Sequence, residues 1–267
     1  MTARLPVRRP APPPTPVGAG VTCLSCDAPL SGAYCAACGQ QAVDLAAPTW
    51  HVLREALADA TDLDGRVLRT LRAAAVPGRL TAEFLRGRRA PYLGPVKLFL
   101  LAGAALSTTW VLTRGVDARF YGYAPDTSAG TYIDTVVRGS LAAALAVALT
   151  GWALARGRRR LLDEAVFALH AVAALSLLAA AVLWLGTAWK AGWGTAARVP
   201  AGVPPLPYLL FLPAAALAPA YLAAALRRVH GGAWWAAALR AAVLTAVGLA
   251  AVAGVLYAGL YLARRPA

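Results

Sequence analysis

The chain has 267 residues, of which 59% are hydrophobic and 14% are charged, against roughly 25% charged residues in an ordinary soluble domain. This composition excludes a conventional water-soluble fold, because too few polar side chains are present to cover the apolar ones. The formal net charge is +14. Such an excess of Lys and Arg indicates either binding to a nucleic acid or an uneven distribution of positive charge at a membrane surface.

The first residues do not have the pattern of a secretory signal peptide. Arginines in residues 1–9 are followed by the proline-rich stretch PAPPPTPVGAG, residues 10–20, instead of an apolar core. We therefore expect a cytosolic N-terminus, with residues 1–20 forming a disordered Pro-rich tail.

The cysteines of the chain form two CxxC pairs that lie close together: Cys23, Cys26, Cys35 and Cys38. Four thiolates at this spacing can surround one zinc ion at roughly 2.3 Å. The gap between the pairs is short, so residues 21–42 are expected to form a minimal zinc ribbon that takes most of its folding free energy from a structural zinc ion. Two disulfides or an iron–sulfur cluster are the alternatives. A catalytic zinc is not indicated, because four thiolates leave no open position for water.

Residues 43–91 are predicted to form amphipathic juxtamembrane helices. From residue 49 to residue 75, apolar side chains recur at helical spacing, with arginines and carboxylates on the other faces. Gly65 is expected to interrupt this pattern and Pro77-Gly78 to end it, after which Thr81 can start a further short helix.

Three arginines and a tyrosine stand directly before the first long apolar run: Arg86, Arg88, Arg89 and Tyr92. We expect them to anchor the protein at the lipid headgroups, with the arginines on lipid phosphates and Tyr92 in the aromatic belt. A second hypothesis makes Arg88 and Arg89 ligands for a specific anionic lipid or substrate. Nothing in the sequence favours this second hypothesis.

Several motifs of this region together resemble a family of bacterial membrane proteins catalogued as a domain of unknown function. They are two CxxC pairs, the second of them as CxxCGQ over residues 35–40, then Arg69-Thr70-Leu71, Pro77-Gly78 and GxRxxYxxP over residues 87–95. Asp27 stands where the first knuckle of the family often has glycine. The resemblance covers about residues 23–113 and implies a zinc ribbon, a linker and a few transmembrane helices. It implies no activity.

Residues 92–267 are predicted to form a transmembrane helical domain, because a spanning helix needs roughly 20 mainly apolar residues. The candidate spans are Tyr92–Thr113, Gly139–Ala155, Val166–Trp189, Val203–Leu226 and Ala241–Ala263. The second is short and rich in alanine, and its failure to span would invert every later orientation. In the fourth, Pro213 and Pro219 should bend the helix. The predicted fold class is an all-α polytopic membrane protein of about five transmembrane helices with a small N-terminal four-cysteine zinc ribbon.

The distribution of Lys and Arg predicts the orientation of these spans. With a cytosolic N-terminus, 19 of the 26 Lys and Arg residues lie on the cytosolic side, as the positive-inside rule favours. We therefore expect a multi-pass protein of the cell (inner) membrane with an external C-terminus. Because topology accounts for most of the positive charge and residues 21–42 contain no Lys or Arg, nucleic acid is not an expected partner.

Few ionisable groups lie in the predicted spans, where such groups would mark catalysis or coupled transport. His170 is expected to be a packed histidine bonded to a neighbouring backbone group. Asp163 and Glu164 are interpreted as charge balance for the arginines before them. No catalytic motif is found, so no catalytic residue is assigned.

The leading hypothesis is a membrane protein without enzymatic activity, surrounded by membrane lipids, whose cytosolic zinc ribbon is a docking head for a protein partner. The alternative is a transporter or lipid-handling protein that uses the bent fourth span and the arginines before the first span. A membrane enzyme is the third hypothesis, because the sequence contains no catalytic constellation.

Overall fold

The computed structural model describes residues 22–32, 34–40, 65–113, 129–156, 158–193 and 206–263. The predicted tail over residues 1–20 and the first part of the predicted amphipathic segment lie outside these residues. The described part of the chain is helical and contains no strand, although Thr22 and Pro29 form an isolated antiparallel bridge.

Where the structure describes the chain, two short helices precede the long ones. Helix α2 comprises Arg66–Ala75 and helix α3 comprises Arg79–Leu85. Gly65 and Gly78 stand directly before them, with φ of 38° and 71°, a region that glycine adopts at little cost. The predicted end of the helix at Pro77-Gly78 is thus found, whereas the stretch before the predicted interruption at Gly65 lies outside the described residues.

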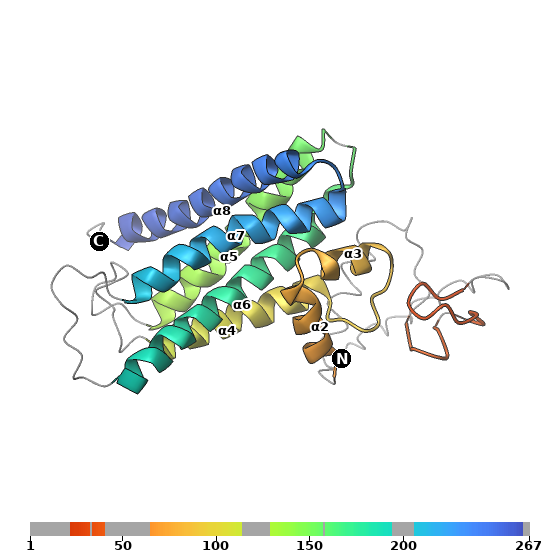
Figure 1. The fold of residues 1–267 in the computed structure, drawn as a ribbon, viewed down its shortest axis with the longest axis horizontal. Helices are drawn as coiled ribbons and strands as arrows, with labels where there is room; N and C mark the ends of the chain where they lie inside the picture. The colour runs from red at the N-terminus through yellow and green to blue at the C-terminus, as the bar shows by residue number, and fades with distance from the viewer. Residues whose placement is uncertain are drawn as a thin grey trace, which may run out of the picture.

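The long helices form an antiparallel bundle (Figure 1). They are α4 (Pro95–Thr113), α5 (Ala129–Leu154), α6 (Leu161–Trp193), α7 (Leu206–His230) and α8 (Trp234–Ala263). Helix α6 packs against α4, α5 and α7, and α8 packs against α5 and α7. Each predicted span overlaps one of these helices in the described part of the chain.

Within the described residues, four segments are long and apolar enough to cross a membrane: Pro95–Leu112, Val136–Leu154, Leu161–Leu185 and Trp234–Val255. The predicted fourth span falls on α7, which remains helical through Pro213 and Pro219, and the count of about five spans stays a prediction. The short second span belongs to a helix of 26 residues. The first turns of this helix, α5, are polar, and in them Asp134 and Arg138 form an ion pair of 2.7 Å.

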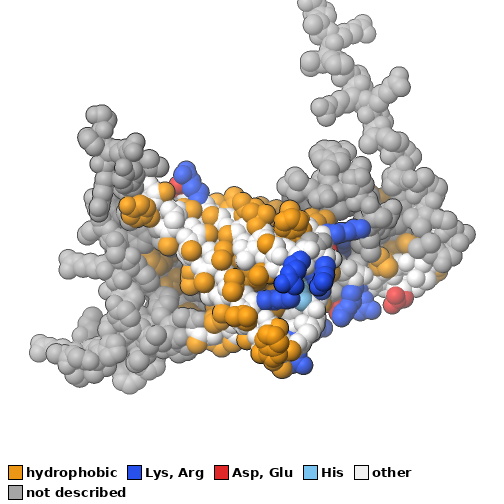
Figure 2. Space-filling model, turned by 90° about the horizontal axis from the view of Figure 1, so that it is seen from above, with side chains coloured by type: hydrophobic (Ala, Val, Ile, Leu, Met, Phe, Trp, Pro, Cys, Tyr) orange, Lys and Arg blue, Asp and Glu red, His pale blue; other side chains and the backbone are white. Residues whose placement is uncertain are grey.

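The outer surface of the bundle is apolar along its length (Figure 2). Large side chains that face outward include Leu100, Leu112, Leu145, Leu185 and Leu249. Such a surface is unfavourable in water, whereas lipid tails solvate it well. The helices and their outer surface together fit a membrane protein.

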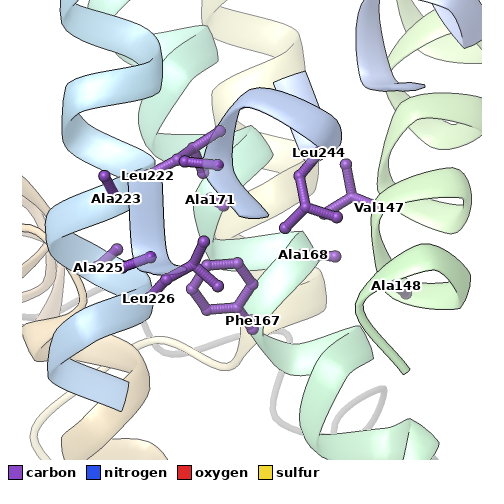
Figure 3. Close-up of a cluster of buried hydrophobic side chains, with 12 residues drawn as sticks. Val147, Ala148, Phe167, Ala168, Ala171, Leu222, Ala223, Ala225, Leu226 and Leu244 are labelled. Atoms are coloured by element: carbon purple, nitrogen blue, oxygen red, sulfur yellow. The ribbon is translucent and has the colours of Figure 1, made fainter. Parts of the chain in front are cut away.

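The core of the bundle lies where α5, α6, α7 and α8 meet (Figure 3). The ring of Phe167 is 2% exposed and packs among Leu222, Leu226 and Leu244. Most other members of this cluster are alanines, which let helix backbones approach closely. The many alanines therefore contribute to tight packing between helices.

Among the described residues, one end of the bundle carries most of the charged side chains. The first turns of α4, α6 and α8 and the last turns of α5 and α7 lie there, beside α2 and α3, and the C-terminal end of α8 lies at the opposite end (Figure 1). Exposed arginines lie at this polar end, among them Arg158 and Arg160 in the α5–α6 connection and Arg227 and Arg228 in the last turn of α7, and Figure 2 shows Lys and Arg gathered there.

Candidate metal centre and its seat on the bundle

The two CxxC pairs form two knuckles with the same backbone hydrogen bonds. In the first, the Cys23 N–H donates to Ala28 O and the Asp27 N–H to Cys23 O, both at 2.8 Å. In the second, the Cys35 N–H donates to Gln40 O and the Gly39 N–H to Cys35 O, again at 2.8 Å. Each CxxC sequence therefore closes a tight turn around its first cysteine.

Both turns need a residue in the left-handed region at the same position. Gly39 supplies it in the second knuckle with φ of 71°, and Asp27 in the first with φ of 60°. Aspartate is one of the few residues other than glycine that adopt this conformation with some ease. Asp27, where the family often has glycine, is thus accommodated by the turn.

The four sulfur atoms lie within 4.8 Å of one another, as the sequence predicts for a metal site. The Cys23 and Cys38 sulfurs are 3.6 Å apart, and those of Cys26 and Cys35 are 3.5 Å apart. A tetrahedron with metal–sulfur bonds of roughly 2.3 Å has edges of about 3.8 Å, whereas a disulfide requires about 2.05 Å. The geometry therefore fits four thiolate ligands around one metal ion, and it does not fit two disulfides.

The local electrostatics favour a thiolate at Cys35 in particular. The backbone N–H of Cys38 lowers the pKa of the Cys35 thiol from 9.0 to about 7, whereas burial and the neighbouring thiols raise the pKa of Cys38 and Cys26. A thiolate, not a thiol, is the form that binds a metal.

The second knuckle is fastened to the loop between α3 and α4 by the side chain of Gln40. Its Nε2 donates to Gly87 O at 2.8 Å, and its Oε1 accepts from the Arg89 and Ala90 backbone N–H groups at 3.1 and 3.0 Å. One side-chain amide thus uses both its donor and its acceptor to bind three backbone groups of the loop. The CxxCGQ and GxRxxYxxP motifs, which the sequence offers separately, are contact partners.

The first knuckle reaches the same loop. Leu24 packs against Gly87, where an added Cβ would lie 2.7 Å from the Leu24 Cδ1 atom. Gly87 also has φ of 90°, so both its conformation and its lack of a side chain are needed. Both knuckles of the ribbon therefore contact the same short loop before α4.

The arginines of this loop make contacts within the protein. Glu83 lies 3.3 Å from Arg86 and 3.5 Å from Arg88, and the Arg89 guanidinium lies 4.8 Å above the ring of Phe84. Tyr92 is partly buried against the cluster that contains Leu93 and Leu98. Contact of Arg86, Arg88, Arg89 and Tyr92 with lipid headgroups or an anion stays a prediction.

The loop is joined in turn to α2 and α4. Thr70, fully buried, donates to Arg66 O at 2.7 Å and accepts from the Leu93 backbone N–H at 2.9 Å. This contact explains the threonine of the Arg69-Thr70-Leu71 motif. An unbroken series of contacts thus runs from the cysteine knuckles through the loop to the first long helix.

The turn between α2 and α3 is seated on α7. An added Cβ at Gly78 would lie 2.7 Å from Ala225 O, and the Tyr221 hydroxyl donates to Ala74 O at 2.7 Å. Arg228 also donates to Pro77 O. The Pro77-Gly78 motif is therefore a close-packed contact with the bundle as well as the end of a helix.

His170 is packed, as predicted, but its partner is a side chain 89 residues away in sequence. Its Nδ1 lies 3.1 Å from the Thr81 hydroxyl on α3, and Phe84 meets its ring edge-on at 5.7 Å. The predicted bond to a neighbouring backbone group is thus replaced by a contact that joins α6 to α3. A cavity of about 10 Å³ beside this contact, lined by Gly78, Tyr221 and others, has room for one water molecule.

Glu164 does not have the surface role that the sequence suggests. Its side chain is 1% exposed, and its Oε1 lies 3.4 Å from Nε2 of His230, the last residue of α7. The sequence places Glu164 beside Arg158, Arg159 and Arg160, which favours charge balance, whereas packing of α5 and α7 covers it. No local pattern could have revealed this burial.

Comparison with known proteins gives one match. A family model described as a protein of unknown function (DUF3667) matches residues 64–106. No curated protein and no solved structure matches the chain. The matched residues comprise α2, α3, the loop that carries the ribbon and the first half of α4, so this chain is similar to an uncharacterised family in the segment where the metal centre joins the bundle.

Proposed function

We propose that this membrane protein uses its four-cysteine site, occupied by structural zinc, to hold a docking head for a protein partner at the cytosolic surface. The observation that carries the proposal is the attachment of Gln40 to Gly87, Arg89 and Ala90. A head on a flexible tether would present its surface in many orientations. A ribbon held against the loop presents one surface in one orientation, and this reduces the entropy lost on binding.

The surface left open on the ribbon suits a protein partner. Tyr34 is 59% exposed, and exposed aromatic side chains are frequent anchors of protein interfaces. Residues 21–42 contain no Lys or Arg, so the ribbon lacks the charge that binds phosphate backbones. The closed set of four thiolates supports a structural rather than a catalytic metal.

The proposed orientation follows from the polar end of the bundle. The ribbon, the loop arginines, the arginines of the α5–α6 connection and those of the last turn of α7 lie at that end, and positive charge favours the cytosolic side. The protein is thus proposed to lie in the cell (inner) membrane with its N-terminus in the cytosol and its C-terminus outside. Labelling of single cysteines introduced at Trp235 and Tyr257, in a chain whose own thiols are blocked, tests this orientation from each side of the membrane.

Photo-crosslinking in native membranes tests the docking role. A photoreactive amino acid at Tyr34 should capture a discrete protein, and capture should be lost when Gln40→Ala detaches the ribbon. The same amino acid at Tyr257, which is 72% exposed on α8, is the matched control and should capture lipid only. Capture of lipid alone at both positions would contradict the docking role.

A transporter or lipid-handling protein is the second candidate, and buried ionisable groups favour it. Glu164 and His170 are 1% and 4% exposed, and the His230 side chain is 8% exposed. Such groups are costly within a membrane bundle and often mark the path of an ion or substrate. Under this hypothesis, Glu164→Gln impairs cellular function more than Gln40→Ala does, and the docking proposal expects the reverse order.

A further inference from the structure

Glu164 occupies a space that the neighbouring helices leave for it. Among the described residues it is the only carboxylate that is buried. Its Oε2 fills the position beside Gly151 of α5, where an added Cβ would lie 2.8 Å away. Glycine at position 151 therefore makes room for the carboxyl group between α5 and α6.

The other carboxyl oxygen faces a single polar group. His230 Nε2 lies 3.4 Å from Oε1, and this buried oxygen has no hydrogen-bond partner. The His230 ring also packs against Phe167, with ring centroids 5.6 Å apart. The pair thus joins the first turn of α6 to the last residue of α7 inside the apolar core.

The helices around the pair differ in the charged groups that they bring near it. Helix α5 contributes the uncharged Gly151. The arginines of α7 have other partners, since Arg227 stacks on Trp234 at 4.2 Å and Arg228 bonds to Pro77 O. The charges that act on the pair are Asp163 beside Glu164, Arg159 before α6, and Arg240 on α8. Two positive charges therefore flank a buried acid and a buried base.

A buried carboxylate without a full set of hydrogen bonds is costly, and so is a buried imidazolium. Burial, with Arg159 and Arg240, lowers the pKa of His230 from 6.5 to about 4, so its imidazole is neutral near pH 7. A neutral imidazole has one nitrogen that accepts a hydrogen bond. A carboxylic acid at Glu164 can donate to that nitrogen, which satisfies both groups without a buried charge.

We propose that Glu164 and His230 form a reversible proton-binding site at the polar end of the bundle. A proton from water adds to the Glu164 carboxylate and forms a carboxylic acid that donates a hydrogen bond to His230 Nε2. Loss of that proton leaves a negative charge between α5, α6 and α7, and a hydrogen bond to His230 then requires the imidazole tautomer that carries its proton on Nε2. The proposal does not depend on a docking partner.

Infrared spectroscopy of the full-length protein in lipid nanodiscs tests this site. From about pH 5 to about pH 9, the unmodified protein should show the C=O absorption of a protonated carboxyl group that disappears as the pH rises. The absorption should be absent in Glu164→Gln and unchanged in Glu83→Gln, the matched variant of a partly exposed acid. His230→Gln should shift the titration midpoint by at least about one pH unit, a tenfold change in proton affinity.

Two results would overturn the proposal. One is the absence of a titrating carboxyl absorption in the unmodified protein, which needs no variant and so does not depend on whether Glu164→Gln folds. The other is an absorption that remains in a folded Glu164→Gln protein or titrates identically in His230→Gln, because the proton would then belong to another group.

Discussion

The side-chain amide of Gln40 donates a 2.8 Å hydrogen bond to the backbone carbonyl of Gly87, 47 residues further along the chain. Gln40 also closes the second knuckle, because its own carbonyl accepts from the Cys35 N–H. The residue that completes the turn around a metal-binding cysteine is therefore the residue that holds the loop before α4. Metal binding and the position of this loop are physically connected.

Removing the Gln40 side chain should release the loop. Gln40→Ala loses three hydrogen bonds at roughly 0.5–1.5 kcal/mol each, so trypsin should cleave after Arg88 and Arg89 at least about tenfold faster in the detergent-solubilised protein. Gln40→Glu is the matched variant, since it keeps an acceptor for Arg89 and Ala90 and loses only the donor to Gly87. It should be cleaved at an intermediate rate, and equal rates for all three proteins would show that Gln40 does not hold the loop.

The left-handed residues of the two knuckles should respond in opposite directions. Gly39→Ala places a side chain at φ of 71°, which costs about 1–2 kcal/mol and should weaken zinc retention against a competing chelator. Asp27→Gly removes a side chain from φ of 60° and should leave zinc retention equal or stronger. A chelator titration of both variants measures this difference, and tighter retention in Gly39→Ala than in Asp27→Gly would contradict the assigned turns.

Gly78 should be far less tolerant of a side chain than Gly94. A Cβ at Gly78 would lie 2.7 Å from Ala225 O, and neither backbone can move without separating α3 from α7. Gly78→Ala should therefore destabilise the protein by roughly 2–4 kcal/mol, seen as a lower thermal unfolding midpoint. Gly94, with no atom within 4 Å of an added Cβ, is the control, and similar midpoints for both alanine variants would argue against this packing.

The buried His230 should make the folded protein less stable as the pH falls into the mildly acidic range. Its pKa is about 4 in the folded protein against 6.5 for the free side chain, so at this histidine only the unfolded chain takes up a proton as the pH falls below about 6.5. The contribution of His230 should lower the stability by up to about 3 kcal/mol between about pH 6.5 and about pH 4. His230→Gln removes this contribution, and an unchanged slope of unfolding midpoint against pH in that variant would show that His230 is not the cause.

The parts of the structure that the sequence predicts are those that depend on local pattern. The spacing of Cys23, Cys26, Cys35 and Cys38 is enough to place four sulfurs together, and long apolar runs are enough to place the bundle helices. Helix boundaries are less well predicted, because an apolar run stops at the first polar residues even where the helix goes on. Helix α5, for example, begins before its apolar part and includes the ion pair of Asp134 and Arg138.

Contacts between distant segments could not be predicted from local pattern. The partner of His170 is Thr81, and Glu164 is covered because Gly151 leaves space for it on another helix. Neither relationship leaves a periodic or compositional trace in the sequence. The sequence contains Gln40 and Gly87 in separate stretches, and nothing in it indicates that the two residues bond to each other.

Hydrogen exchange of the full-length protein in nanodiscs, with and without its metal, tests the central claim most directly. The protein should contain one zinc ion per chain, and the Arg89 and Ala90 amides should be protected until a chelator removes that ion. Their exchange should then accelerate at least about tenfold, while exchange within α6 stays unchanged. A zinc content far below one ion per chain, or protection of Arg89 and Ala90 that survives metal removal, would contradict a metal-held ribbon seated on the membrane bundle.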